Sequence, residues 1–235
     1  MKLASLKQGR DGALVIVSKD LSKYVSADSV ASTMQAALDD WKNAEPKLIA
    51  LYNDLQSGKI KGDDFDPSLC DAPLPRSYHW VDGSAYVTHV ELVRKARGAE
   101  LPKSFWTDPL MYMGASDAFI GARDDVLVEA EEWGIDFEGE VAVITDDVPA
   151  GTSKAGAMKH IKLISILNDV SLRNLIPGEL AKQFGFYQSK PWTSFAPVFV
   201  SPDELDDAWD GKKLSLPLHT LLNGQKIGSP DAGID

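Results

Sequence analysis

The sequence predicts a mixed α/β protein rich in β-structure, with a small N-terminal domain ahead of a larger, β-rich one. Three observations support this prediction: a helical period over residues 27–57, a Gly-, Asp- and Pro-rich stretch over residues 58–75, and short alternating apolar segments from residue 104 onward. The chain has 235 residues, of which 44% are hydrophobic, so it can bury a substantial core.

The N-terminal part is expected to contain a short strand and a long helix. The run Ala-Leu-Val-Ile-Val over residues 13–17 is bounded by Gly12 and Lys19, which is typical of a buried strand. Apolar residues recur at helical spacing over residues 27–57, continuing past Pro46. Residues 58–75 then predict a linker, so we place domains at residues 1–75 and 76–235.

The second part begins with a predicted helix over residues 83–96, with Asp82 as its possible N-cap. Five segments then have the texture of short strands: residues 126–131, 137–145, 160–167, 196–201 and 214–228. Asn223-Gly224 in the last segment predicts a hairpin turn. The sequence contains neither an internal repeat nor a Gly-rich phosphate loop.

Composition excludes several classes of function. The formal net charge of −11 opposes binding to nucleic-acid phosphates. The single cysteine, Cys70, leaves no internal disulfide, which fits a reducing compartment. The sequence has no signal-peptide pattern and no apolar stretch of the roughly 18 residues needed to span a membrane. These features predict a cytoplasmic protein that does not bind membranes or nucleic acid.

Four acidic residues form a candidate metal site. Glu138 and Glu140 lie two apart in a predicted strand, where such residues project from the same face and repel each other unless a cation compensates. Asp169 ends a predicted apolar strand, and Asp82 precedes a predicted helix. Carboxylate oxygens without histidine or cysteine suit Mg²⁺ or Ca²⁺. A solvated strand face and two helix N-caps would explain the same residues without a metal.

Three basic residues are candidates to act together with these carboxylates. His89 lies seven residues after Asp82, about two helical turns, so the two side chains would share one face of a helix. A histidine near a bound divalent cation could act as a general base for water. The alternative is an ordinary helix histidine. Lys190 lies in the aromatic segment QSKPWTSFAP, where it could face an anion or extend its stem along a loop. Arg173 could bind a substrate carboxylate or pair with Asp169.

These segments, in this order, resemble the fumarylacetoacetate hydrolase family over about residues 76–235. That family has an Asp upstream of a His, an E-x-E pair on a strand, an N-D-x-S-x-R segment and a K-S-F-D-T-F-A-P-like segment. The matching segments here are Asp82 with His89, EGE, NDVSLR and KPWTSFAP. A family Tyr-x-Gly segment is similar to Tyr112-Met113-Gly114. Residues 1–75 are similar to the variable N-terminal domain of the larger bacterial members.

The resemblance implies a rolled β-sheet catalytic domain, usually in a homodimer. It implies a Mg²⁺, Ca²⁺ or Mn²⁺ ion that acts as a Lewis acid on a small β-diketo acid. The implied metal ligands are Asp82, Glu138, Glu140 and Asp169. His89 would activate water, and Lys190 would stabilise the developing negative charge. The implied substrate-binding residues are Tyr112, Arg97, Arg173 and Ser194.

The resulting prediction is a metal-dependent hydrolase that cleaves a C–C bond in fumarylacetoacetate or an acylpyruvate, in the catabolism of aromatic compounds such as tyrosine. Two alternatives stay open: a 2-oxo acid decarboxylase, hydratase or isomerase on the same scaffold, and a metal-binding protein without turnover. The chain departs from the family at Ile176, where hydrolytic members have Gln, and at Leu92, where smaller members have Glu. Members continue with a helix and a G-T-x-x-G segment, so the catalytic domain is expected to be incomplete after Asp235.

Overall fold

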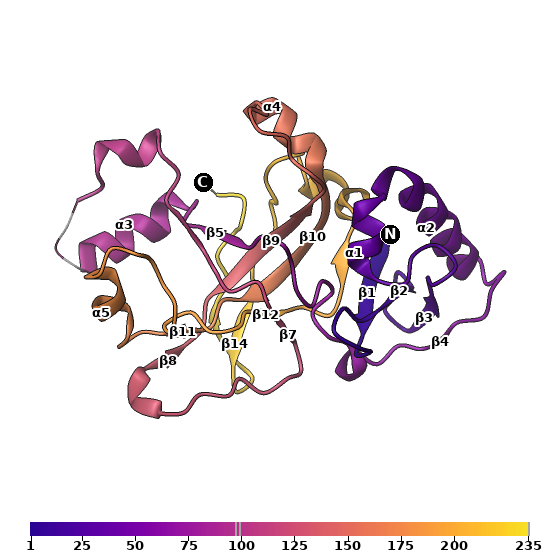
Figure 1. Cartoon of the computed structure of the whole chain (residues 1–235), viewed down its shortest axis with the longest axis horizontal. Coiled ribbons are helices and arrows are strands. Elements are labelled where there is room, and N and C mark those ends of the chain that lie inside the picture. Colours follow the sequence, from indigo (N-terminus) through magenta and orange to yellow (C-terminus); the bar gives the residue numbers. More distant parts are fainter. Residues whose placement is uncertain (97, 99, 235) are drawn as a thin grey trace.

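The computed structural model describes residues 1–96, 98 and 100–234 (Figure 1). The helices are α1 (Met34–Asp39), α2 (Trp41–Gln56), α3 (Val87–Ala96), α4 (Lys154–Ala157) and α5 (Ile176–Leu180). The strands are β1 (Lys2–Leu6), β2 (Ala13–Val17), β3 (Lys23–Ser26), β4 (Asp63–Asp64), β5 (Val81–Gly83), β6 (Met111–Met113), β7 (Ile120–Gly121), β8 (Ile135–Asp136), β9 (Gly139–Thr145), β10 (Ile161–Asn168), β11 (Ser171–Leu172), β12 (Ser194–Phe195), β13 (Phe199–Val200), β14 (Thr220–Leu222) and β15 (Gln225–Gly228).

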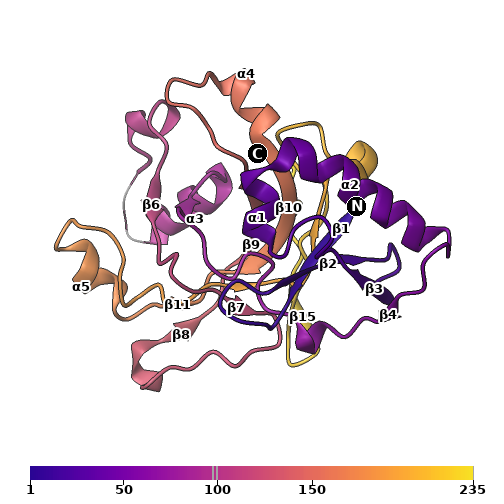
Figure 2. The same cartoon turned by 45° about the vertical axis from the view of Figure 1, so that its right-hand side comes forward.

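One mixed sheet dominates the part of the chain that the structure describes. Its nine strands follow the order β4-β3-β2-β1-β13-β10-β12-β7, with β9 paired to β10. All neighbours are antiparallel except β12 and β7, which are parallel. The sheet curls into a half-barrel (Figures 1 and 2), and the fold is mixed α/β, as predicted. Because β1 pairs with β13, the sheet is continuous across the expected boundary after residue 75, and that boundary stays a prediction.

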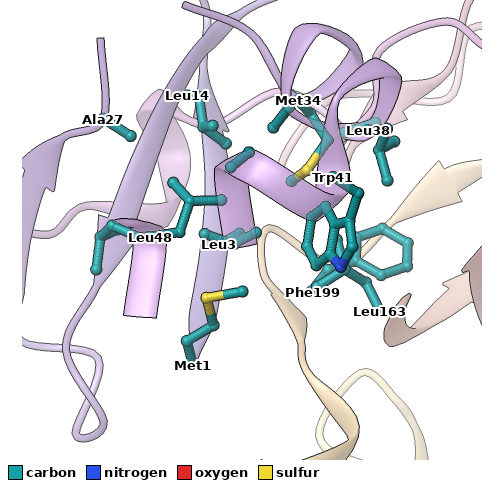
Figure 3. Close-up of a cluster of buried hydrophobic side chains, with 14 of the residues drawn as sticks. Met1, Leu3, Leu14, Ala27, Met34, Leu38, Trp41, Leu48, Leu163 and Phe199 are labelled. Atoms are coloured by element: carbon teal, nitrogen blue, oxygen red, sulfur yellow. The ribbon is translucent and has the colours of Figure 1, made fainter. Parts of the chain in front are cut away.

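The hydrophobic core joins the N-terminal segment to the central strands. Apolar side chains of α1 and α2 pack over β1 and β2 and meet Leu163 of β10 and Phe199 of β13 (Figure 3). Leu3, Leu48 and Leu163 are fully buried. Burying a side chain of this size contributes about 1.5–3 kcal/mol. The N-terminal elements therefore brace the strands that carry the candidate site.

Several local elements differ from those that the sequence predicts. The helix expected over residues 27–57 begins at residue 34, where the Thr33 side chain caps it by accepting the Ala36 N–H, and it divides at Asp40. The helix expected from residue 83 begins at Val87, because residues 81–83 form β5 and pair with β6. Residues 126–130 form no strand, and a 3₁₀ turn follows at Glu131–Trp133. Of these differences, the one at residues 81–83 follows from pairing with a distant segment.

The strongest local signals are confirmed. The predicted strands over residues 13–17, 137–145 and 160–167 correspond to β2, β9 and β10. Asn223 and Gly224 have φ values of 50° and 80°, which a two-residue hairpin turn requires, and they join β14 to β15. Among the described residues, no helix has the length and apolar character needed to cross a membrane.

Candidate active site

The β9–β10 pair brings the predicted acidic residues together. Glu140 on β9 lies opposite Leu167 on β10, and Asp169 directly follows β10, two residues beyond Leu167. Since side chains alternate between the faces of a strand, Glu140 and Asp169 project from the same face. The Asp169 N–H donates to the Glu138 carbonyl oxygen at 2.9 Å, which holds the ends of the two strands in register.

The β5–β6 pair adds a third carboxylate and a phenol. Asp82 lies directly opposite Tyr112 in this two-stranded sheet. The Tyr112 hydroxyl donates to Asp169 Oδ2 at 2.9 Å. Asp82 is thus a strand residue rather than a helix N-cap, and the expectation that it shares a helix face with His89 is wrong.

One ammonium group lies at the centre of this cluster. Lys190 Nζ donates to Asp169 Oδ2 at 2.6 Å, to Glu138 Oε2 at 2.9 Å and to Ser171 Oγ at 2.8 Å. The Lys190 side chain is 7% exposed and the Asp169 side chain 1%. Burial alone would lower the pKa of Lys190, but Asp169 and Glu138 outweigh it and raise that pKa above its ordinary value. Lys190 therefore stays protonated at neutral pH.

Asp82, Glu140 and Asp169 can each place one carboxylate oxygen so that the three atoms lie within 4.8 Å of one another. Burial, followed by contact with Asp169, raises the pKa of Asp82 to about 7. Burial, followed by the charges of Asp82 and Asp169, raises the pKa of Glu140 to about 9. Crowded, desolvated carboxylates are the ligand set of a hard divalent cation, whose charge would remove this repulsion. The acidic triad therefore fits a divalent metal site.

Glu138 makes different contacts. Its carboxylate accepts from Lys190 and lies 2.6 Å from Arg173 Nη2. Burial would raise the pKa of Glu138, but Lys190 and Arg173 outweigh burial and lower it. Arg173 also donates through Nε to Asp136 at 2.7 Å and does not pair with Asp169. Glu138 thus forms ion pairs with Lys190 and Arg173, and its role as a metal ligand stays a prediction.

In the described part of the chain, the side chains of His89 and Ser194 form no hydrogen bond with this cluster. His89 is exposed on the first turn of α3. The Ser194 hydroxyl donates to the Gly121 carbonyl oxygen at 3.3 Å, on the pairing between β12 and β7. Arg97 lies outside the described residues. The roles of all three stay predictions.

Two matches to protein-family models cover nearly the whole chain. Residues 1–76 match fumarylacetoacetase N-terminal domain 2, and residues 78–232 match the C-terminal domain of fumarylacetoacetate hydrolase. The chain belongs to the fumarylacetoacetate hydrolase family. Proteins similar to this chain are named as a hydrolase, a tautomerase and an isomerase, so the similarity does not choose among these reactions.

Solved structures, among them a fumarylacetoacetate hydrolase, share this fold. The fumarylacetoacetate hydrolase of Exiguobacterium antarcticum superposes with a TM-score of 0.68 at 17% identity, over 98% of this chain and 75% of that chain. A maleylpyruvate hydrolase of Sphingobium sp. SYK-6, solved with manganese(II) and pyruvate, superposes with a TM-score of 0.65 at 12% identity, over 99% and 77%.

Curated relatives in the family have different activities. One is a 2,4-didehydro-3-deoxy-L-rhamnonate hydrolase from Sphingomonas sp. (strain SKA58), 27% identical over 52% of this chain and 41% of that protein. Another is a human mitochondrial oxaloacetate tautomerase, 23% identical over 63% of this chain and 43% of that protein. The chain spans about half of the length, or less, of the curated relatives that it matches.

Sequence reasoning did not single out several residues that complete the cluster. Ser171 accepts from Lys190 and donates to the Asp169 carbonyl oxygen at 3.1 Å. Thr193 Oγ1 lies 3.4 Å from Asp169 Oδ1. The Phe186 ring packs edge-on against Tyr112, with 4.7 Å between the ring centroids. Ser171 and Thr193 lie within the NDVSLR and KPWTSFAP segments, so those segments were the available signal; Phe186 had none.

Proposed function

We propose that this chain carries the active site of a metal-dependent hydrolase that cleaves a C–C bond in a β-diketo acid such as fumarylacetoacetate or an acylpyruvate. The observation that carries the proposal is the meeting of three mutually close carboxylates with the buried ammonium of Lys190. A metal ion held by these carboxylates and the ammonium of Lys190 can both face the oxygens of a dicarbonyl group. Catabolism of aromatic compounds such as tyrosine, in the cytoplasm, is the proposed setting, and a homodimer the proposed assembly.

Asp82, Glu140 and Asp169 are the proposed ligands of a Mg²⁺, Ca²⁺ or Mn²⁺ ion, with Glu138 as a further candidate. When bound, the ion supplies Lewis-acid polarisation of the substrate's keto and enol oxygens. Carboxylate crowding at Asp82 and Glu140, expressed in their raised pKa values, supports this assignment.

Lys190 is proposed to stabilise the negative charge that develops as the C–C bond breaks. Three contacts fix its ammonium in one position, so little reorganisation is needed during the reaction. Tyr112 keeps its proton, because burial and the charges of Asp169 and Asp82 raise its pKa. Its hydroxyl donates to Asp169 in this structure and would have to turn from that carboxylate to donate to a substrate oxygen.

His89 is the proposed base for water. It lies in the segment that directly follows the strand of Asp82, and its exposed side chain is open to solvent. It would take a proton from the water that adds to the acyl carbon, and the electron pair of the broken C–C bond would pass to the departing enolate carbon. Arg173, Ser194 and Arg97 are the remaining candidates for binding the substrate.

A tautomerase or isomerase is the second candidate function. The observation that favours it is the meeting of Lys190 and Tyr112 at Asp169 in the buried cluster, where the two could polarise a 2-oxo acid without an activated water. The similarity to a human oxaloacetate tautomerase supports this reading as well.

Product analysis tests both candidates. The protein is incubated with fumarylacetoacetate, a simple acylpyruvate and oxaloacetate, with Mg²⁺, Ca²⁺ or Mn²⁺ and then with EDTA, while diketone absorbance is followed. Metal-dependent loss of absorbance with two acid fragments supports the hydrolase. Interconversion of keto and enol forms without new acids supports the tautomerase, and release of CO₂ indicates a decarboxylase. A metal-independent reaction, or none on any substrate, would contradict the proposal.

A further inference from the structure

The segment that carries Lys190 into the acidic cluster has little regular structure. Residues 181–193, between α5 and β12, form turns and irregular backbone, with Gln183 and Gly185 at φ values of 63° and 94°. Phe184 and Tyr187 in this segment are 97% and 86% exposed, so their side chains do not anchor it. Yet Ser189 and Lys190, immediately afterwards, are buried. The backbone that leads into Lys190 therefore needs an anchor other than these two aromatic side chains.

The carboxylate of Glu179, on α5, provides that anchor. Its two oxygens accept the backbone N–H groups of three consecutive residues, Tyr187, Gln188 and Ser189, at 3.0, 2.7 and 3.2 Å. The Ser189 hydroxyl donates a fourth bond at 2.5 Å. Consecutive N–H groups that converge on one anion form a nest, and bonds to a charged acceptor are stronger than neutral ones.

The Glu179 nest acts on the residues that touch the cluster. Lys190 directly follows Ser189, whose carbonyl oxygen is tied to the Leu172 N–H at 2.8 Å. Phe186 precedes the nest by one residue, and its ring rests against Tyr112. Lys190 Nζ lies 5.9 Å from the centroids of both rings. One carboxylate thus binds the backbone that lies between Phe186 and Lys190.

We propose that Glu179 is a positioning residue of the active site, which holds the 187–189 backbone so that Lys190 meets Asp169 and Glu138. This inference rests on the role proposed above for Lys190. The Glu179 carboxylate bonds to Tyr187, Gln188 and Ser189 rather than to Lys190 or the acidic triad, so its effect passes through the backbone. Its assignment follows from the three N–H bonds and the adjacent buried lysine.

The first test reads the backbone directly and needs no activity. In Glu179→Ala, we expect amide hydrogen exchange over residues 187–189 to become about tenfold faster or more, because the nest loses its anion. Glu179→Gln retains one acceptor oxygen and is expected to show a smaller change. The matched control, Glu129→Gln, alters an exposed carboxylate and leaves this exchange unchanged. Unchanged exchange in Glu179→Ala would overturn the proposal.

The second test asks whether the effect reaches Lys190. A short pulse of sulfosuccinimidyl acetate should leave Lys190 largely unmodified in the natural chain and acetylate it in Glu179→Ala, with exposed Lys182 as internal reference. Equal protection of Lys190 in both proteins would contradict the proposal, whatever the protein's activity.

The third test uses turnover and separates positioning from general damage. We expect Glu179→Ala to lower kcat by about 10- to 100-fold with little change in KM, since small misplacement of a catalytic group has effects of this size. In a Lys190→Met background, Glu179→Ala should cause no further loss of kcat. An equal loss in both backgrounds would show that Glu179 does not act through Lys190. Absence of turnover in the natural chain would refute the proposed function and leave the exchange and acetylation tests standing.

Discussion

Replacing Lys190 with methionine removes the ammonium while retaining most of the side chain's volume. Lys190 Nζ lies 2.6 Å from Asp169 and 2.9 Å from Glu138, and both its side chain and that of Asp169 are buried. Removing one partner of a buried ion pair leaves an uncompensated charge and costs about 3–5 kcal/mol. For a chain of this size the metal-free protein should therefore lose about 6–20 °C in Tm.

A divalent cation should reverse much of this loss, because it supplies the missing positive charge to the same carboxylates. At a free concentration of 100 times Kd, the ion stabilises the folded state by about 2.7 kcal/mol. The rise in Tm on adding Mn²⁺ should be larger in Lys190→Met than in the natural chain, where the ammonium repels the ion. The assay is thermal unfolding in EDTA and in Mn²⁺, with Lys182→Met as the control for an exposed lysine. An equal rise in both proteins, or a loss below about 1 kcal/mol, would refute this reasoning.

The remaining predictions concern pH, the N-terminal contacts and a close approach of two segments. The pKa values of Asp82 and Glu140 are raised to about 7 and about 9, so the folded chain holds protons that the unfolded chain has lost. The Tm in EDTA should therefore fall from pH 6 to pH 8. In Glu140→Gln, this dependence of Tm on pH should become weaker. A steeper slope in that variant would contradict the assignment. Glu204 accepts a hydrogen bond from the Tyr52 hydroxyl at 2.6 Å and lies 3.1 Å from the buried Met1 amino group. Glu204→Gln should therefore lower the free energy of unfolding in urea by about 1.5–3 kcal/mol. The exposed control Asp203→Asn should lower it by less. A Cβ on Gly121 would lie 2.6 Å from the Cys70 carbonyl oxygen, so Gly121→Ala should cost about 1–3 kcal/mol; an unchanged urea midpoint would show that this contact relaxes freely.

The sequence predicts best those elements that have a strong local pattern, such as an apolar run or a pair of turn residues. The apolar runs that became β2, β9 and β10 and the Asn223-Gly224 turn carry strong local signals, and Asp169 was correctly expected at the end of a strand. Glu140 and Asp169 meet because the β9–β10 pairing places both on one face, whereas Asp82 joins them through the pairing of β5 with β6. The family model covering residues 78–232 supports the resemblance on which the assignment of roles rested.

What the sequence could not predict depends on pairing between distant segments. The segment at residues 81–83 has a plausible helix start in Asp82, but it pairs with residues 111–113, and that pairing placed Asp82 opposite Tyr112 rather than under His89. Glu138 and Glu140 look equivalent in the pattern E-x-E, yet Lys190 and Arg173, 52 and 35 residues further along the chain from Glu138, draw Glu138 into separate ion pairs. The nest around Glu179 depends on backbone N–H groups, which carry no sequence signal.

Titration with Mn²⁺, followed by calorimetry, tests the central claim most directly. If Asp82, Glu140 and Asp169 hold a divalent cation, the natural chain should bind one ion per acidic triad and release protons on binding, because the pKa values of Asp82 and Glu140 are raised. Glu140→Gln should then abolish binding, while the exposed control Glu129→Gln should leave it intact. Equal Mn²⁺ affinity in the natural chain and in Glu140→Gln would contradict the metal site and the mechanism built on it.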